Sequence, residues 1–349
     1  MRIDGRYGEG GGSILRLATA LSAITGNTVV VDNIRSNRSR PGLAPQHLTG
    51  LKALARLFSA RTQGLSLGST KVKFVPRSPR GGQLSVDVGT AGSIGLVLQT
   101  LMIVVPFVGE PTEISLTGGT HVRWSPNIDY LERVTLPIMR RMGYRGTLSL
   151  IQPGYYPKGG GKVIFKGEPW QGLEAVSLED FGQVESIGGI SRASNLPKHV
   201  PMRQADAAKS LLSDRVEPEV FVTTERAMSP GSAITLWAET SEGCILGSSS
   251  LGEKGKPAEE VGTEAARDMK AFIDSRSPVD PFLLDQILPY ASLADGKSVF
   301  ESVKLTDHAL TNIHVIGEFL NSQIEVEGDR GGSCRIEVYG ADLEGSWNV

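Results

Sequence analysis

The sequence has little cysteine. Its 349 residues include only Cys244 and Cys334, which lie far apart and form no Cys-x-x-Cys pair. That scarcity excludes a disulfide framework and a cysteine-based zinc site. A chain with so few thiols suits a reducing compartment, so we expect a cytoplasmic protein.

An excess of charge of one sign is also missing. The 36 Lys and Arg residues are balanced by 38 Asp and Glu residues, which gives a formal net charge of −2. This balance excludes a chain-wide basic surface of the kind that coats a long nucleic acid, so any nucleic-acid contact has to be local. Charged residues make up 21% of the chain and hydrophobic residues 40%, which is typical of a folded globular protein.

Long hydrophobic runs are absent as well. The longest apolar stretch, 94–108, is interrupted by Gln99, Thr100 and Pro106. It is shorter than the roughly 20 apolar residues that cross a bilayer. The stretch therefore predicts a buried helix, and we expect no membrane association.

Hydrophobic periodicity predicts two copies of one βαβαββ unit. The first copy comprises a strand at 2–3, a helix from 13, a strand at 28–31, a helix at 46–59 and a hairpin at 63–67 and 71–75. The second copy, in the same order, comprises 83–88, 93–107, 113–116, 126–142, 147–151 and 162–165. Both helices recur 80 residues later, which indicates an internal duplication.

A third copy is predicted to be split by an insertion. Its parts are an opening strand within 183–190, helices at 281–292 and 308–320, and strands at 298–303, 324–326 and 334–338. The inserted segment has its own pattern of helices at 203–212 and 258–273 and strands at 219–223 and 233–239. The predicted fold class is α/β (α+β). It combines a large domain of three βαβαββ repeats, residues 1–184 and 278–349, with a smaller inserted α/β domain, residues 185–277.

A glycine-rich loop at 8–12 directly precedes the first helix. Glycines there let backbone N–H groups approach a phosphate at the positive end of the helix, although a tight strand-to-helix turn would need them equally. Glu9 lies inside this loop. A carboxylate at a phosphate site is useful if a divalent cation bridges the two, and otherwise it is a capping or solvated residue.

Arginine and histidine supply further candidate groups. Arg35, Arg38 and Arg40 cluster beside a proline-stiffened segment, where they suit either bidentate phosphate binding or a solvated loop. His308 follows Thr306 and Asp307, either of which can cap a helix that begins there. The positive end of that helix would keep the ring neutral and nucleophilic, whereas a single histidine is otherwise more often structural.

Several motifs occur together along the chain in a fixed order. They lie at 8–16, 40–43 with 46–48, 118–120, 154–161, 285–286 and 308–313. Their sequences resemble the signatures of the RNA 3′-terminal phosphate cyclase family, from the first residues to near the C-terminus. The resemblance implies the same fold of three repeats with a small inserted domain.

The resemblance also implies a reaction. Members of this family join AMP to a histidine, using ATP and a divalent metal, Mg²⁺ or Mn²⁺. They then pass AMP to an RNA 3′-phosphate end, and the ribose 2′-hydroxyl attacks that phosphate and expels AMP. The product is a 2′,3′-cyclic phosphate, and the implied partner is RNA with a 3′-phosphate end.

The resemblance assigns roles by position. His308 would be the nucleophile and Glu9 the metal ligand, and the adenine would lie between Pro126 and Phe282, where the family commonly has another ring. The remaining nucleotide-binding residues would be Gln99, Leu283, Leu284, Asp285 and Gln286. The groups expected at the phosphate or RNA end are Arg16, Arg38, Arg40 and Gln46.

Three other functions are compatible with parts of this pattern. A non-cyclising relative that serves ribosome assembly has the same fold but lacks the nucleophilic histidine, so His308 argues against it. A transferase acting on a small anion predicts no covalent nucleotide. A non-catalytic RNA-binding protein predicts RNA affinity that depends on neither ATP nor His308. The apolar edge strands of the repeats would tolerate a homodimer.

Overall fold

The strands and helices follow one another in three βαβαββ units, described over residues 1–169 and 171–341 of this computed structural model. The first unit comprises β1 (Arg2–Asp4), α1 (Ser13–Thr25), β2 (Val29–Asp32), α2 (Pro45–Leu57), β3 (Arg61–Gln63) and β4 (Val72–Val75). The second comprises β5 (Gly82–Asp87), α3 (Ile94–Val104), β6 (Thr112–Gly118), α4 (Ile128–Tyr130), α5 (Leu136–Arg141), β7 (Gly146–Gln152) and β8 (Gly161–Gly167). The third comprises β9 (Ser177–Leu178), α8 (Pro281–Ala291), β14 (Lys297–Ser302), α9 (Asp307–Phe319), β15 (Gln323–Glu327) and β16 (Cys334–Tyr339).

The three units share one sheet topology. Their sheets run β1-β2-β4-β3, β5-β6-β8-β7 and β9-β14-β16-β15. In each sheet the first two strands are parallel and the other pairs are antiparallel. The predicted mixed α/β fold with three βαβαββ repeats is confirmed.

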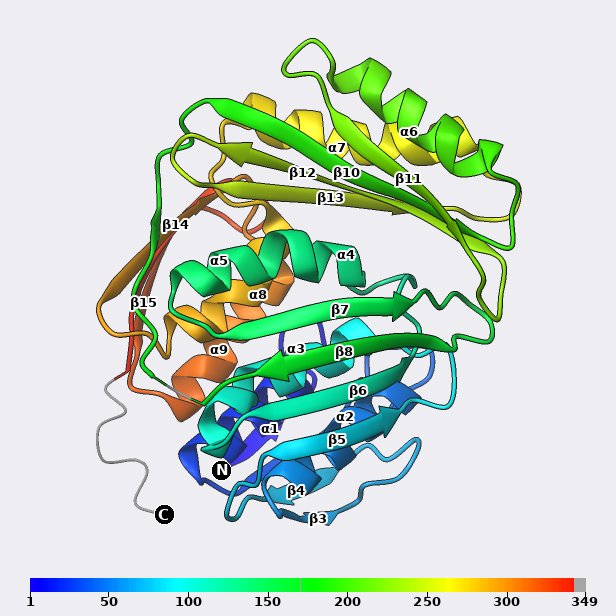
Figure 1. Ribbon diagram of the computed structural model, residues 1–349. Coiled ribbons are helices and arrows are strands. Elements are labelled where there is room, and N and C mark those ends of the chain that lie inside the picture. The colour runs from blue at the N-terminus through cyan, green and yellow to red at the C-terminus, as the bar shows by residue number, and fades with distance from the viewer. Residues whose placement is uncertain (170, 342–349) are drawn as a thin grey trace.

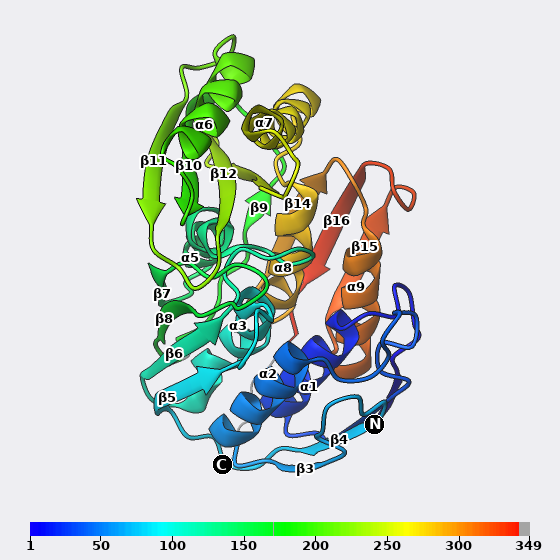
Figure 2. The same cartoon turned by 90° about the vertical axis from the view of Figure 1, so that its right-hand side faces the viewer.

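The helices of the three repeats pack together between the sheets (Figure 2). Helix α1 contacts α2, α3 and α9, and α8 contacts both α3 and α9. One continuous apolar core joins them, and its members include Leu21 of α1, Leu98 of α3, Leu283 of α8 and Val315 of α9. Because the helices share this core, the loops before them are held close to one another.

A separate sheet lies between β9 and α8 in the sequence. It contains β10 (Val184–Ser194), β11 (Glu219–Glu225), β12 (Gly231–Thr240) and β13 (Ile245–Leu251) in the order β11-β10-β12-β13. Helices α6 (His199–Leu212) and α7 (Ala258–Ser275) cover one face of this sheet (Figure 1) and share a second apolar core with it. The opposite face approaches α4 of the large unit.

One strand prediction was wrong, and another was correct in kind but displaced along the chain. The third repeat does not open within 183–190, because β10 pairs with β11 and β12 of the separate sheet. The strand that does open it, β9, has only two residues, too few to show periodicity, and pairs in parallel with β14. The first strand of the hairpin, expected at 63–67, is β3 at Arg61–Gln63, and it is followed by a turn in which Gly64 and Gly68 have φ values of 74° and 75°, which glycine adopts readily.

Buried ionic contacts join the inserted sheet to the large unit. Arg192 of β10 donates to both oxygens of Asp129 of α4 at 2.7 and 2.9 Å, and His121 lies 3.0 Å from the same carboxylate. Burial alone would raise the pKa of Asp129, but the hydrogen bonds from His121 and Arg192 hold that pKa below its usual range. Asn127 adds a 2.9 Å hydrogen bond to Thr235 of β12.

Asp280 connects three parts of the fold. Its carboxylate caps α8 by accepting from the N–H groups of Phe282 and Leu283 at 2.9 and 3.0 Å. The same carboxylate accepts from the Tyr130 hydroxyl at 2.8 Å and from the Gly247 N–H of β13 at 2.9 Å. Burial raises the pKa of Asp280 to about 6 although these hydrogen bonds oppose the rise. Asp280 therefore links the start of α8 to Tyr130 and to the inserted sheet.

Among the described residues, every helix is too short or too polar to cross a lipid bilayer.

We expect Asp280→Ala to lower the free energy of unfolding by about 2–4 kcal/mol, because it removes a helix cap and leaves buried donors unpaired. Urea unfolding followed by circular dichroism measures the change. Asp206→Ala, at an exposed position of α6, is the matched control and should change stability by less than about 0.5 kcal/mol. Equal effects of the two substitutions would contradict the linking role of Asp280.

Candidate active site

The glycine-rich loop at 8–12 lies between the Arg35–Arg40 loop and helix α9. Gly8 and Gly10 have φ values of 54° and 61°. A side chain at Gly8 would collide with Thr311 of α9, and one at Gly10 would collide with Asn37. Glycine is therefore required at both positions, by the backbone conformation and by the close approach of neighbours.

Glu9 joins these three segments. Its Oε2 atom lies 2.8 Å from Nδ1 of His308, and its Oε1 atom forms an ion pair with Arg38. Oε2 is buried and accepts no hydrogen bond among the described residues. The loop before α1, the arginine loop after β2 and the start of α9 thus meet at a single carboxylate.

His308 is the second residue of α9, and its side chain is 46% exposed. Thr306 caps the helix by accepting from the Ala309 N–H at 2.9 Å. Partial burial lowers the pKa of His308, Arg16 and Arg38 lower it further, and Asp285 acts in the opposite direction. The lowered pKa favours the neutral imidazole, and the ring is partly accessible from solvent.

Helix α8 presents its first turns beside His308. Asp285 accepts a hydrogen bond from the Thr306 hydroxyl, and its carbonyl accepts from Asn312 at 2.7 Å. Burial raises the pKa of Asp285 to about 7, which the bond from Thr306 opposes. These contacts fix the start of α9 against α8.

The other predicted residues of α8 differ in accessibility. Phe282 is 55% exposed and packs edge-to-face on Tyr130, with ring centroids 6.5 Å apart. Gln286 is buried and donates to the Phe282 carbonyl at 2.8 Å. The side chains of Leu283 and Leu284 are fully buried in the core. Of the 282–286 stretch, the Phe282 ring is therefore the side chain most available to a ligand.

Pro126, just before α4, contacts the first turn of α3, and Gln99 lies in the middle of that helix. The Pro126 carbonyl packs so closely on Gly95 that any side chain there would collide with it. Gln99, one helical turn further along α3, accepts a hydrogen bond from Arg16 of α1 at 3.1 Å. The residues predicted to bind the nucleotide therefore come from α3 and the loop before α4 in the second repeat, and from α8 in the third.

Arg16 is a cation without an acidic partner in the described structure. Burial lowers its pKa to about 10, so the guanidinium remains charged at neutral pH. A buried charge of this kind is costly unless an anion accompanies it. Arg16 is therefore the strongest candidate on α1 for binding a phosphate.

The remaining predicted phosphate-binding residues lie around it. Arg38 contacts Glu9, whereas Arg40 is exposed two residues further along the same loop. Gln46, near the start of α2, lies against Gly92, and the next residue, His47, lies against Gly12 of the glycine-rich loop. The structure thus brings Arg16, Arg38 and Gln46 to the site and leaves Arg40 at its rim.

His47 is a site neighbour that the sequence indicated only weakly. It packs against Gly12, it is 4% exposed, and its Nδ1 atom has no hydrogen-bond partner among the described residues. Burial and the nearby charges of Arg16 and Arg35 hold its pKa well below the usual range. Its position directly after Gln46 was the one available signal.

A divalent cation fits this site only together with a ligand. Within residues 1–169 and 171–341, no three His, Cys, Asp or Glu side chains cluster as a metal centre. Glu9 offers one carboxylate beside groups suited to phosphates. One carboxylate plus phosphate oxygens is a common way for proteins to hold Mg²⁺, so the residues present are compatible with such an ion.

Comparison with known proteins gives a consistent result. The family model described as RNA 3′-terminal phosphate cyclase matches residues 7–326. The RNA 3′-terminal phosphate cyclase of Pyrococcus furiosus is 45% identical over 338 residues, 96% of this chain and 98% of its own length. The proteins of the same name from Pyrobaculum aerophilum and Methanosarcina barkeri are 44% and 45% identical, over 97% and 95% of this chain and 98% of each relative. With its glycine-rich loop, paired glutamate and exposed histidine in place, the chain belongs to the RNA 3′-terminal phosphate cyclase family.

Proposed function

We propose that this protein uses ATP to convert an RNA 3′-phosphate end into a 2′,3′-cyclic phosphate, through an AMP bonded to His308. One observation carries the proposal: a half-exposed imidazole with a lowered pKa lies beside a carboxylate and near Arg16, which has no acidic partner among the described residues. A non-cyclising relative, as described above, would lack this histidine.

The geometry favours one ring nitrogen as the nucleophile. Nδ1 of His308 faces Glu9 at 2.8 Å, so a proton on Nδ1 would interact favourably with that carboxylate. The lone pair then resides on Nε2, which attacks the α-phosphorus of ATP. A phosphorus–nitrogen bond forms and pyrophosphate leaves with the electrons of the broken phosphoanhydride bond.

The two later steps use the same groups. An oxygen of the RNA 3′-phosphate attacks the phosphorus of the histidine-bound AMP, the phosphorus–nitrogen bond breaks, and an anhydride between RNA and AMP forms. The ribose 2′-oxygen then attacks the RNA phosphorus, loses its proton and expels AMP. This last attack is intramolecular, which favours it by proximity.

The basic residues neutralise phosphate charge in each displacement. A phosphate monoester is a poor electrophile because it carries nearly two negative charges. Arg16, Arg38, Arg40 and Gln46 would bind the phosphates of ATP and of the RNA end. A divalent cation, Mg²⁺ or Mn²⁺, held by Glu9 and phosphate oxygens would supply additional charge neutralisation.

The adenine is proposed to lie between Pro126 and Phe282. Phe282 presents an exposed ring, and Pro126 is fixed against the start of α3. Gln99, Asp285 and Gln286 would contact the nucleotide with polar groups, and Leu283 and Leu284 through their backbone only, since their side chains are buried.

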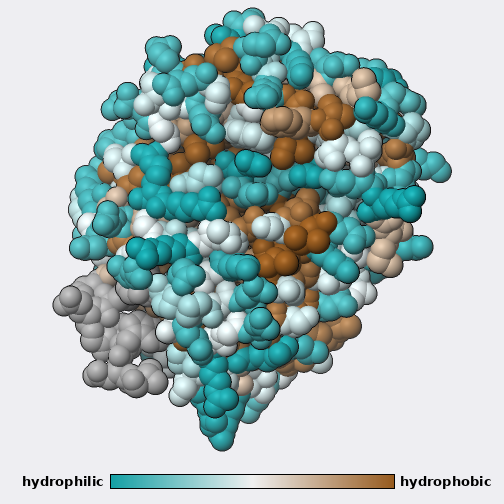
Figure 3. Space-filling view, viewed as in Figure 1, coloured by the Kyte–Doolittle hydropathy of each residue, from teal (hydrophilic) through white to brown (hydrophobic). Residues whose placement is uncertain are grey.

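Cellular setting, boundaries and oligomeric state stay predictions. The two cysteines are free and buried, which suits the expected cytoplasmic location. Residues 185–277 are proposed to form the inserted domain. Hydrophobic residues gather near the middle of one face of the molecule (Figure 3). Two strands at sheet edges also carry exposed apolar side chains: Ile151 of β7 is 58% exposed and Phe221 of β11 is 59% exposed. Such edges are compatible with the homodimer expected above.

We expect His308→Ala to lower ATP-dependent cyclisation of a 3′-phosphate oligoribonucleotide by at least about 1,000-fold, because the attacking nitrogen is lost. Resistance of the RNA end to phosphatase measures the product. His314→Ala is the control on the same helix, since His314 stacks on Tyr7 at 3.7 Å rather than on Glu9, and it should keep activity within severalfold. Cyclisation by His308→Ala at the wild-type rate would overturn the proposed mechanism.

The rate of AMP transfer to the protein should depend on a group that titrates below pH 6.5, because the pKa of His308 is lowered from that value. The neutral imidazole reacts, so the rate falls only as pH drops through this lowered pKa. Arg38→Gln removes a cation that lowers the pKa and should move the midpoint upward, whatever it does to the plateau. Arg61→Gln, exposed on β3, should leave the midpoint unchanged, and a midpoint above 6.5 in the wild type would contradict this assignment.

A further inference from the structure

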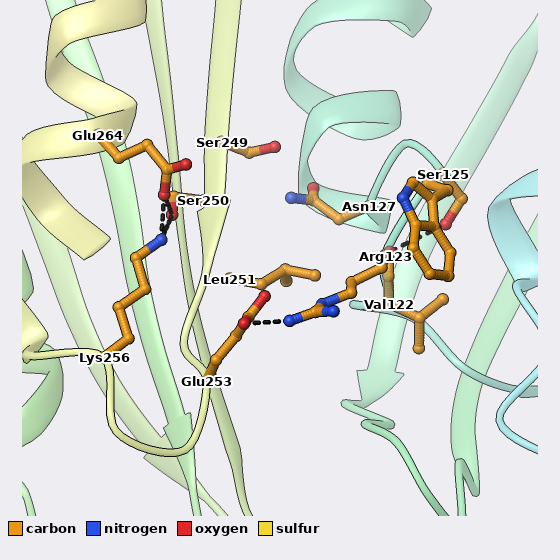
Figure 4. A pocket seen from close by; sticks show the side chains of 11 residues that line it. Val122, Arg123, Ser125, Asn127, Ser249, Ser250, Leu251, Glu253, Lys256 and Glu264 are labelled. Atoms are coloured by element: carbon orange, nitrogen blue, oxygen red, sulfur yellow. Dashed lines mark hydrogen bonds and ion pairs between the residues drawn. The ribbon is translucent and has the colours of Figure 1, made fainter. Parts of the chain in front are cut away.

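A second cavity lies between the large unit and the inserted sheet. Its volume is about 350 Å³, within the size range of small-ligand sites. One wall is the 122–127 segment that leads into α4, and the other is formed by β13, the loop after it and α7 (Figure 4). We call it the interdomain cleft.

The walls of the interdomain cleft are fixed. Asn127 caps α4 by accepting from the Tyr130 N–H at 2.8 Å and donates to Thr235 of the inserted sheet at 2.9 Å. Arg123 pairs across the cleft with Glu253, as Figure 4 shows. The two walls are therefore held together by two polar contacts, Asn127 with Thr235 and Arg123 with Glu253.

The charges of the interdomain cleft cancel one another. Arg123 pairs with Glu253, and Lys256 pairs with Glu264. The lining also contains hydroxyl and amide groups, from Ser125, Asn127, Ser249 and Ser250. A phosphate would meet carboxylates here as often as cations, so the chemistry suits a neutral ligand that forms many hydrogen bonds.

Trp124 supplies an aromatic surface to the same cleft. Its side chain is 91% exposed, which is unusual for a large apolar ring. Its φ of 61° lies in the left-handed region, which a bulky residue seldom adopts. A neutral polar pocket with an exposed indole matches a nucleoside, in which a flat base can stack while ribose and base edges form hydrogen bonds.

The interdomain cleft adjoins the candidate active site. Pro126 lies between the wall residues Ser125 and Asn127, and its carbonyl packs on Gly95 at the first turn of α3. Gln99 lies about 6 Å further along that helix, at a rise of 1.5 Å per residue, and contacts Arg16. These contacts connect the wall of the cleft to Arg16, the cation proposed above to bind a phosphate of the substrate.

We propose that the interdomain cleft binds a nucleoside of the single-stranded RNA that precedes the 3′-terminal nucleotide, with its base stacked on Trp124. This inference rests on the proposed function, because it assigns part of the same substrate. It predicts that Trp124 contributes to RNA affinity and contributes nothing to the reaction of the protein with ATP.

The test measures RNA binding by fluorescence anisotropy without ATP, using a labelled single-stranded oligoribonucleotide with a 3′-phosphate. Unlabelled fragments of increasing length, from a nucleoside 3′-phosphate upward, compete for the site. The variants are Trp124→Ala and Trp124→Phe, with Tyr156→Ala as the control, since Tyr156 is 79% exposed outside the cleft lining. AMP labelling of the protein from ATP is measured in parallel.

We expect Trp124→Ala to weaken binding of the oligoribonucleotide about tenfold, the effect of one lost stacking contact. Binding of the nucleoside 3′-phosphate and AMP labelling should stay within twofold of the wild type, Trp124→Phe should restore most of the affinity, and Tyr156→Ala should have no effect. Unchanged oligoribonucleotide binding in Trp124→Ala would overturn the inference. Slower AMP labelling in that variant would also overturn it, because the cleft would then serve ATP.

The series of fragments of increasing length shows which nucleotide of the RNA occupies the cleft. If Trp124→Ala weakened the mononucleotide and the longer fragments equally, the cleft would hold the terminal nucleotide and the proposed placement would be wrong. Failure of the proposed function has a different signature, because then the wild type itself would acquire no AMP from ATP. The anisotropy measurement needs no turnover and still decides whether RNA uses Trp124.

Discussion

The contact between the Glu9 carboxylate and the ring of His308 is the interaction on which the proposed site depends. It joins the loop before α1, in the first repeat, to the N-terminus of α9, in the third. The contact exists because both helices pack in one apolar core. In the proposed mechanism Nδ1 faces this carboxylate and Nε2 attacks, so the choice of nucleophilic atom would follow from a packing arrangement between repeats.

Around this contact the fold keeps several charged groups partly out of water. Arg16 has no acidic partner in the described structure, and burial raises the pKa of Asp285 to about 7. Both features cost stability in the protein alone. An anion bound near Arg16 would compensate its charge, which agrees with the proposed phosphate-bearing ligand.

Sequence patterns predict much of the fold, but some strands have no recognisable pattern. The 80-residue offset between helices predicted the duplication, and the shared strand order of the three sheets confirmed it. The two residues of β9 are too few for periodicity, and β13, rich in serine, was not predicted. The motifs indicated Glu9 and His308 separately, but no local pattern shows that their side chains meet, because 299 residues separate them.

The central claim is that the AMP bond forms on His308, and mass mapping of the modified residue tests it most directly. The wild-type protein is incubated with ATP and Mg²⁺ without RNA, digested under mildly alkaline conditions that preserve phosphoramidates, and sequenced by tandem mass spectrometry. The account predicts AMP on the peptide that contains His308, at that residue alone. AMP on His47 or on a lysine, with His308 unmodified, would contradict it.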